Sequence, residues 1–232
     1  MKRVAVFVEG WTEFFFVARL IEEMAGFGRV HLRMEHQHGG TPHLYRRAGA
    51  PEEAADIEVL LMNCCGDGKV KSYILERKQL LINMGYSFVI GLQDLFPKPF
   101  VDWERFEAGL NQGLGGDPRV KIVMALQVME AEAWFLNESK HYKKIDPRLT
   151  IPHVKALAGF DPVSDPAETK IAHPAKLLDK IYKSVGLGYA KKESEVRRTV
   201  DALDYEELFV TVRAMSKSLS GFLFQLETAG IC

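Results

Sequence analysis

The sequence predicts an α/β protein with a doubly wound and mainly parallel sheet, and three observations support that prediction. Short apolar runs that suit buried strands alternate with segments whose apolar residues recur at helical spacing. Several of these runs end on acids or glycines, as parallel strands do at a ligand-binding edge. With 232 residues, of which 47% are hydrophobic and 26% charged, the chain can bury a proper core.

The expected elements follow in order along the chain. Strands are expected at 4–8, 30–34, 57–62, 86–92 and 120–128. Helices are expected from Thr12, which can cap the first one, to the glycines at 26 and 28, and then at 69–84, 103–114 and 129–136. The glycines and proline of residues 36–43 predict an irregular loop. Beyond Asn137 the composition changes, and helical stretches are expected at 174–185, 194–202 and 205–226.

Two parts are therefore expected, an α/β core at 1–136 and a helical C-terminal extension packed on it at 137–232. The net charge of -1 gives no general attraction to nucleic acid, so phosphate binding must come from local basic patches or metal ions. Cys64, Cys65 and Cys232 form neither a disulfide framework nor a zinc ribbon, which favours reduced cysteines in the cytoplasm. Nowhere do about 18 apolar residues run together, so no membrane span is expected.

Acidic residues end three of the expected strands. Glu9 follows the first, Asp94 follows the fourth, and Glu130 with Glu132 follow the fifth. Mg²⁺ prefers oxygen ligands, and carboxylates gathered at one sheet edge suit it. Glu13, four residues after Glu9, can project from the first helical turn toward the same edge. A plainer interpretation is that loops are polar and that Glu13 only complements the helix dipole.

The run from Val8 to Glu13 resembles the VEGxTE signature that opens the Toprim domains of OLD-type nucleases and of small bacterial relatives. In Toprim proteins the first glutamate follows strand one, a DxD motif follows a later strand, and together they bind Mg²⁺. Here residues 93–97 stand at the second place, and Phe96 occupies the position of the second acid. The resemblance thus implies a Toprim-like fold with an incomplete DxD motif.

Other segments extend this resemblance over most of the chain. Residues 127–136 are similar to an E-x-E-A segment, which implies that Glu130 and Glu132 replace the missing acid. Residues 173–176 and 189–191 are similar to HPSK and YxK pieces, which implies that Lys176 and Lys191 contact the scissile phosphate. The plain alternative is that both lysines are solvated surface residues.

These observations predict a nuclease that depends on Mg²⁺ or Mn²⁺, cleaves phosphodiester bonds of nucleic acid, and has a role in phage defence. The expected catalytic residues are Glu9, Asp94, Lys176 and Lys191, and the expected metal ligands are Glu9, Glu13, Asp94, Glu130 and Glu132. The alternative is a catalytically degenerate Toprim module that binds or regulates an ABC-class ATPase. The resemblance implies such a partner, which could restrain the nuclease; a homodimer is also open.

Three further features of the sequence are candidates for a function. The stretch 66–69 lacks the GxxxxGK[ST] and GxGxxG patterns, so it is expected to start a helix, with Lys69 or Lys71 touching nucleic-acid backbone. The remaining two are sets of side chains. His36, His38 and His43 are interpreted as an active-site rim or nucleic-acid contact, with a zinc site as the alternative. Trp103, Phe106, Phe222, Phe224 and Leu226 are expected in the core rather than in a base-stacking surface.

Overall fold

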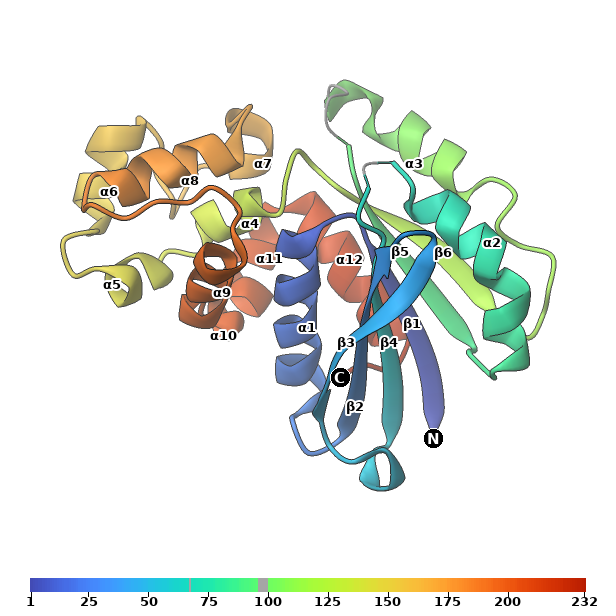
Figure 1. Ribbon diagram of the computed structural model, residues 1–232. Coiled ribbons are helices and arrows are strands. Elements are labelled where there is room, and N and C mark those ends of the chain that lie inside the picture. Colours follow the sequence, from blue (N-terminus) through green and yellow to red (C-terminus); the bar gives the residue numbers. More distant parts are fainter. Residues whose placement is uncertain (67, 96–99) are drawn as a thin grey trace. The chain divides into compact units, whose positions relative to one another are not determined.

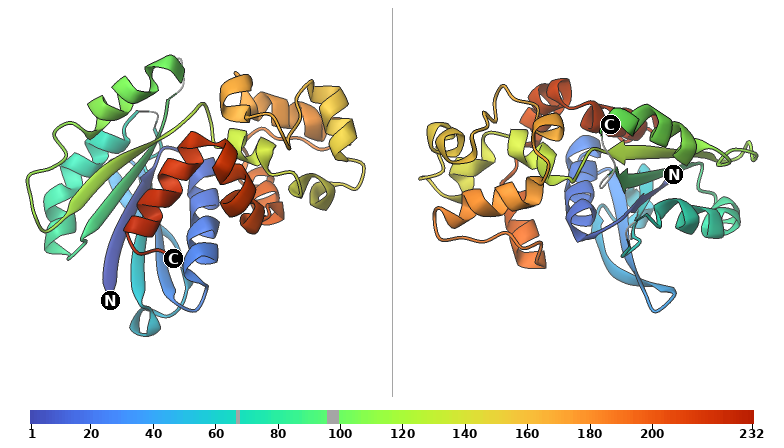
Figure 2. Two further views of the ribbon diagram at one scale, coloured as in Figure 1. Left: turned by 180° about the vertical axis from the view of Figure 1, so that it is seen from behind. Right: turned by 90° about the horizontal axis from the view of Figure 1, so that it is seen from above.

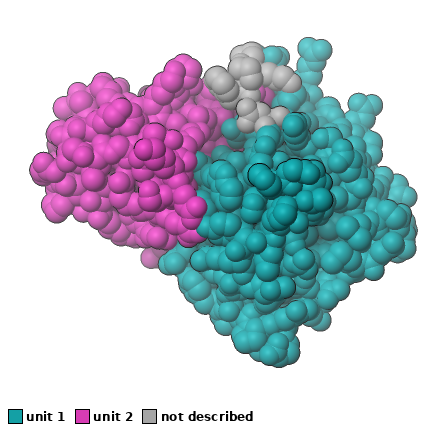
Figure 3. Space-filling model, viewed as in Figure 1, with its two compact units in different colours: residues 1–94, 101–126, 221–232 teal, residues 95–100, 127–220 magenta. Residues whose placement is uncertain are grey.

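The computed structural model describes residues 1–66, 68–95 and 100–232, so Asp67 and Phe96 lie outside the described residues. The chain divides into two compact units (Figure 3). Unit 1 comprises residues 1–94, 101–126 and 221–232, and unit 2 comprises residues 95–100 and 127–220. This division is a different partition of the chain from the expected ranges 1–136 and 137–232.

A six-stranded sheet forms the centre of the α/β fold (Figure 1). Its strands are β1 (Lys2–Val8), β2 (Val30–His38), β3 (Thr41–Gly49), β4 (Ile57–Asn63), β5 (Phe88–Asp94) and β6 (Lys121–Gln127), in the order β3-β2-β4-β1-β5-β6. β1 runs parallel to β4 and β5, β2 runs parallel to β4, and β3 pairs with β2 in antiparallel fashion. The predicted α/β class and mainly parallel sheet are confirmed.

Helices cover both faces of this sheet in unit 1 (Figure 2). They are α1 (Trp11–Ala25), α2 (Val70–Asn83), α3 (Trp103–Asn111) and the end of α12 (Lys217–Thr228). The short helices η1 (Glu52–Ala54) and η2 (Phe100–Asp102) lie in the connections between β3 and β4 and between β5 and α3. α1, which follows β1, lies on one face, whereas α2, which follows the adjacent β4, lies on the other. Neighbouring strands whose connections leave toward opposite faces open a crevice at their carboxyl ends.

Alternation along β1 explains why it is buried on both sides. Ala5 and Phe7 pack with Val70 and Ile74 of α2 in one apolar cluster. Val4, Val6 and Val8 have the opposite parity and are likewise fully buried. A strand that is buried on both faces requires the continuous apolar run that the sequence shows.

The irregular loop expected at residues 36–43 is wrong, because these residues form a β-hairpin. β2 continues to His38, and β3 begins at Thr41 after only two residues. Both of those residues are glycines with positive φ, 55° at Gly39 and 85° at Gly40. A tight primed turn requires positive φ at its two central positions, and the adjacent glycines supply it without steric cost.

Gly49 ends β3 in a conformation that admits no side chain. Its φ is 75°, and a Cβ there would lie 2.1 Å from the carbonyl oxygen of Val30. We expect Gly49→Ala to lower the free energy of unfolding by about 2–4 kcal/mol, because both the backbone angle and the contact would be strained. Urea unfolding measures this, with Gly109→Ala in α3 as control, since a Cβ at Gly109 meets nothing within 4 Å. Equal losses in the two variants would contradict the account.

Unit 2 consists mainly of short helices. They are α4 (Glu132–Asn137), α5 (His141–Ile145), α6 (Ile151–Ala158), α7 (Ala167–Lys170), α8 (Pro174–Lys183), α9 (Glu193–Ala202), α10 (Tyr205–Glu207), the π-helical η3 (Leu208–Val212), α11 (Arg213–Met215) and the start of α12. None of the helices in the described ranges is long and apolar enough to cross a membrane.

The single helix expected at 205–226 is wrong, because Ser216 interrupts it with φ -117° and ψ 110°. The break is stabilised by Glu168, which is 3% exposed and accepts hydrogen bonds from the hydroxyls of Ser216, at 2.6 Å, and Ser218, at 2.7 Å. Glu168 also accepts from the backbone N–H of Lys217 at 2.7 Å. A buried carboxylate thus satisfies the donors at the start of α12.

Candidate functional site

Glu9 lies directly after β1, at the carboxyl edge where the connections that follow β1 and β4 leave toward opposite faces of the sheet. The residue is only 7% exposed. One carboxylate oxygen, Oε1, accepts the backbone N–H of Gly68 at 2.6 Å, and the other, Oε2, accepts the backbone N–H of Asp94 at 3.2 Å. The side chain therefore joins three places at one edge: the end of β1, the loop after β4 and the end of β5.

Backbone hydrogen bonds also join the chain around Glu9 to the loop after β4. Its carbonyl oxygen accepts the N–H of Gly66 at 3.2 Å, and the carbonyl of Val8 accepts the N–H of Cys64 at 2.9 Å. The amides of the glycine turn before α2 thus point at Glu9 rather than toward a nucleotide phosphate. This geometry agrees with the expectation that residues 66–69 start a helix, although Asp67 lies outside the described residues.

α1 begins one residue earlier than expected. Gly10 occupies the N-cap position in an extended conformation, and Thr12 lies within the helix, so the predicted Thr12 cap is wrong. Glu13 stands in the first turn, 5% exposed. A Cβ at Gly10 would lie 3.1 Å from Oε2 of Glu13, so glycine leaves room for this carboxylate beside the Glu9 backbone. Glu9, Glu13 and Asp94 therefore lie at the same edge of unit 1.

Two buried amides at this edge were not predicted from the sequence. Asn63 ends β4 and is 0% exposed, and Gln93 is the penultimate residue of β5 and 6% exposed. Nδ2 of Asn63 and Oε1 of Gln93 have no hydrogen-bond partner within the described part of the chain. Buried polar atoms normally have partners, so both amides are candidates to meet a bound group. The sequence signal that could have identified them is an amide residue at or next to the end of each of these two apolar strands.

Cys64 and Cys65 follow β4 and differ in their surroundings. Burial, as the largest cause, and the nearby Cys65 and Glu9 together raise the pKa of the Cys64 thiol to about 12. Cys64 is therefore a protonated thiol that packs beside Val70 and Ile74 in the core, and it is a poor metal ligand at neutral pH. Cys65 is exposed, with φ 50°.

Unit 2 contains a second acidic cluster, which Lys191 bridges. Nζ of Lys191 lies 2.8 Å from Oε1 of Glu130 and 3.3 Å from Oε2 of Glu132. Glu132 is completely buried, and its Oε1 accepts the hydroxyl of Tyr189 at 2.7 Å. Sequence reasoning did not assign Tyr189 a role in this cluster. Within unit 2 the YxK piece thus contacts the E-x-E segment, a pairing that the sequence did not predict.

The backbone that carries this cluster is unusual at two positions. Lys191 has φ 58° and Met129 has φ 63°, in the left-handed region that residues other than glycine seldom adopt. Because Met129 is left-handed, the helix expected from residue 129 begins only at Glu132. Oε2 of Glu130 accepts the N–H of Ala175 at 3.0 Å, in the first turn of α8. Lys176 is the next residue of that turn and is exposed.

The expected site residues thus form two sets. Glu9, Glu13 and Asp94 belong to unit 1, and Glu130, Glu132, Lys176 and Lys191 belong to unit 2. That both sets serve one metal stays a prediction. Among the described residues, no group of three or more histidines, cysteines, aspartates or glutamates has the geometry to hold a metal ion.

The edge at Glu9 nevertheless fits Mg²⁺. This ion keeps several waters and is usually held by one or two carboxylates together with substrate phosphates, so a closed protein cage is not required. Backbone N–H groups fix both Glu9 oxygens at this edge, and carboxylate oxygens are the ligands that Mg²⁺ prefers. The buried amides of Asn63 and Gln93 can orient coordinated waters.

The remaining candidate side chains of the sequence differ in burial and in partners. Nζ of Lys71 donates to the carbonyls of Gly109, at 3.1 Å, and Gln112, at 2.8 Å, so it stabilises the end of α3. Phe224 is 57% exposed, which makes its predicted core position wrong. The remaining aromatic and apolar residues of that set are buried or half-buried, namely Trp103, Phe106, Phe222 and Leu226.

Fold and site together define an α/β protein whose mainly parallel sheet has a buried, backbone-tethered glutamate at its carboxyl edge. Comparisons of the chain with protein-family models, with curated proteins and with solved structures found no match. The function therefore has to be inferred from the residues and their geometry.

Proposed function

We propose that this protein is a Mg²⁺-dependent nuclease with a Toprim-like fold that cleaves phosphodiester bonds of nucleic acid. The observation that supports it most is the position of Glu9, the first acid of the VEGxTE-like run. Glu9 lies where the connections after β1 and β4 leave toward opposite faces of the sheet. Ligands of open α/β sheets bind at that place. The neighbouring Glu13 and Asp94 supply further carboxylates at the same edge.

Each residue set has a distinct part in this proposal. Glu9, Glu13 and Asp94 would hold the cation on unit 1, and Glu130 and Glu132 of unit 2 are the further carboxylates that the resemblance implies. When bound, Mg²⁺ supplies an activated water and neutralises charge on the phosphate. Lys191 offsets the charge of Glu130 and Glu132 and keeps them oriented. The exposed Lys176 is the residue proposed to meet a phosphate oxygen.

Metal-dependent cleavage of defined nucleic acids tests this proposal. Fluorescent single-stranded DNA, single-stranded RNA, duplex DNA and tRNA are incubated with the protein in Mg²⁺, in Mn²⁺ and in EDTA. We expect cleavage of at least one substrate with either metal, none in EDTA, and recovery when excess Mg²⁺ is added. Cleavage that persists in EDTA, or no cleavage of any substrate in either metal, would contradict a metal-dependent nuclease.

A second candidate function is a catalytically degenerate module that regulates an ABC-class ATPase. Phe96, at the position where the resemblance places the second acid of DxD, is the observation that favours it. The readout is the ATP hydrolysis rate of a purified ABC-class ATPase, with and without this protein. A change in that rate, together with no cleavage in Mg²⁺ or Mn²⁺, would favour the regulatory function over the nuclease.

A further inference from the structure

Trp11 presents an aromatic ring to solvent immediately after Glu9 and Gly10. It is 36% exposed, whereas Trp103 is 4% and Trp134 0% exposed. Its ring stacks on that of Phe15, with centroids 5.7 Å apart and planes inclined by 25°. The ring centroid of Phe14 lies 5.5 Å from that of Trp11, and the two ring planes are nearly perpendicular. The buried phenylalanines therefore fix the orientation of a tryptophan that remains accessible.

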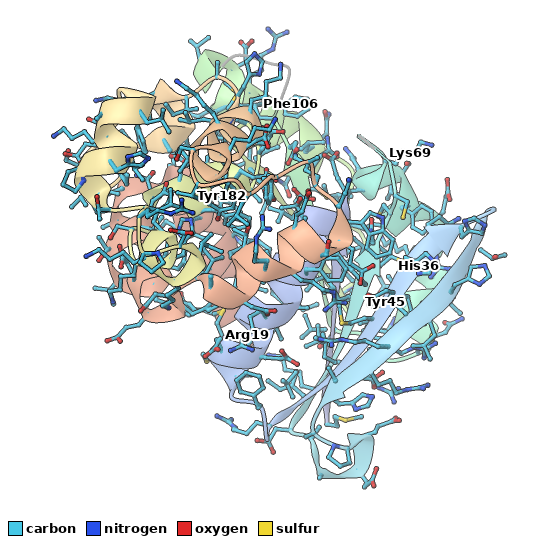
Figure 4. All side chains as sticks on the ribbon, turned by 60° about the vertical axis from the view of Figure 1, so that its left-hand side comes forward. Arg19, His36, Tyr45, Lys69, Phe106 and Tyr182 are labelled. Carbon is cyan, nitrogen blue, oxygen red and sulfur yellow. The ribbon has the colours of Figure 1, made fainter. Side chains whose placement is uncertain are left out.

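The β2–β3 hairpin extends this aromatic surface. The ring centroids of His36 and Tyr45 lie 5.5 Å and 5.7 Å from that of Trp11, and the ring centroid of His43 lies 6.0 Å from that of His36. Figure 4 shows His36 and Tyr45 on the hairpin. His36 is in register with Asn63, and Asn63 with Val8, so these rings lie at the carboxyl edge that carries Glu9. Nδ1 of His36 is buried without a hydrogen-bond partner in the described residues.

The hairpin carries a local excess of positive charge. Residues 30–49 contain Arg33, Arg46 and Arg47 against the single acid Glu35, a net charge of +2 in a protein whose net charge is -1. Glu35 is paired with Arg33, whose Nη2 lies 2.5 Å from Oε1 of Glu35. Arg46 and Arg47 are exposed on the edge strand. A polyanion is the partner that this charge favours.

We infer that Trp11, His36, His43 and Tyr45 form a stacking surface for the bases of single-stranded nucleic acid, with Arg46, which pairs with Met34 on the same face of the hairpin as His36, for its phosphates. This inference rests on the proposed function, because it names the form in which the substrate reaches the same edge. Accessible aromatic rings beside basic side chains are how proteins hold single strands. Bases within a duplex are already stacked on one another, so paired nucleic acid gains nothing from these rings.

A simpler role for the same rings is to cover the apolar end of α1. That role accounts for Phe14 and Phe15, which are 0% and 4% exposed. It gives no role to the part of the Trp11 ring that stays exposed beside the exposed Arg46. The two roles also predict different behaviour, since a covering ring has no reason to respond to nucleic acid.

Trp11 is a natural probe, because the other two tryptophans are buried. Tryptophan fluorescence is recorded while a 12-nucleotide single-stranded DNA, the matching RNA, or the DNA duplex of the same sequence is added in EDTA, so that no metal-dependent cleavage occurs. We expect quenching by at least one single strand, lost in Trp11→Phe, and little effect of the duplex. Unchanged fluorescence with saturating single strand, or equal quenching by the duplex, would overturn the inference.

Binding of the same labelled single strands, followed by fluorescence anisotropy in EDTA, gives the second measurement. We expect Trp11→Ala to weaken binding about tenfold and Trp11→Phe to restore most of it. Phe224→Ala is the matched control, because Phe224 is an exposed ring of unit 1 on α12. Wild-type affinity in Trp11→Ala would refute the stacking surface even if Mg²⁺-dependent cleavage were intact. Conversely, stacking without cleavage in Mg²⁺ or Mn²⁺ would reject the nuclease and leave this inference standing.

Discussion

Glu9→Gln is expected to reduce Mg²⁺-dependent cleavage by a factor of about 10² or more. The substitution removes the negative charge nearest to the proposed cation, and loss of several kcal/mol of metal-derived stabilisation corresponds to at least that factor. Initial cleavage rates at saturating Mg²⁺, measured on the substrate that wild type prefers, give the value. A rate within twofold of wild type would remove Glu9 from the mechanism.

The variant needs a structural control, because the glutamine amide must face one of the two backbone N–H donors that Glu9 accepts. That mismatch leaves a buried donor unpaired and costs about 1–3 kcal/mol. Asp94→Asn avoids the problem, since Glu9 uses the backbone of Asp94 and not its side chain. We expect the same kinetic loss in Asp94→Asn, and its unfolding curve is measured beside that of Glu9→Gln. Glu76→Gln, on the exposed surface of α2, is the matched control and should retain full activity.

Lys191→Met is expected to lower the free energy of unfolding by about 2–4 kcal/mol. Removing one partner of a buried ion pair leaves an uncompensated charge, and Glu132 is completely buried. The Lys191 side chain is 40% exposed, so solvent screens part of this cost and the expected loss lies below that of a fully buried pair. Urea unfolding followed by circular dichroism measures the change.

Lys183→Met provides the comparison within the same unit. Nζ of Lys183 lies 2.6 Å from Asp179, but the lysine is 67% exposed and its partner 24% exposed. Exposed pairs of this kind contribute about 0.3–0.5 kcal/mol, so Lys183→Met should have little effect. If the two lysine variants were equally stable, Lys191 would not be the counter-ion that keeps Glu130 and Glu132 in place.

Much of the fold follows from local sequence pattern. The apolar run before Glu9 predicts a strand buried on both faces, and β1 is that strand. Strand ends shifted by a few residues, as at Asp94, which the structure includes in β5. The hairpin was missed because glycines signal both irregular loops and primed turns, and the pairing of β3 with β2 decides between them.

The site was predictable as a set of acids but not as a set of contacts. Acidic strand ends and the resemblance pointed to Glu9 and Asp94 as candidates. Local pattern says nothing of a carboxylate that accepts hydrogen bonds from the backbone N–H groups of the loop after β4 and of the end of β5. Asn63 was overlooked because an amide at a strand end is common, and only its complete burial makes it notable. Likewise, the bond from Tyr189 to Glu132 joins residues 57 positions apart.

Metal binding tests the central claim most directly, because it requires neither a known substrate nor a partner. Mn²⁺ is titrated into wild type, Glu9→Gln and Glu76→Gln, and free Mn²⁺ is measured by electron paramagnetic resonance, with Mg²⁺ added as competitor. The account predicts a site that Mg²⁺ displaces in wild type and Glu76→Gln, and that is weakened at least tenfold in Glu9→Gln. Equal Mn²⁺ binding by all three proteins would contradict the claim that Glu9 holds the metal.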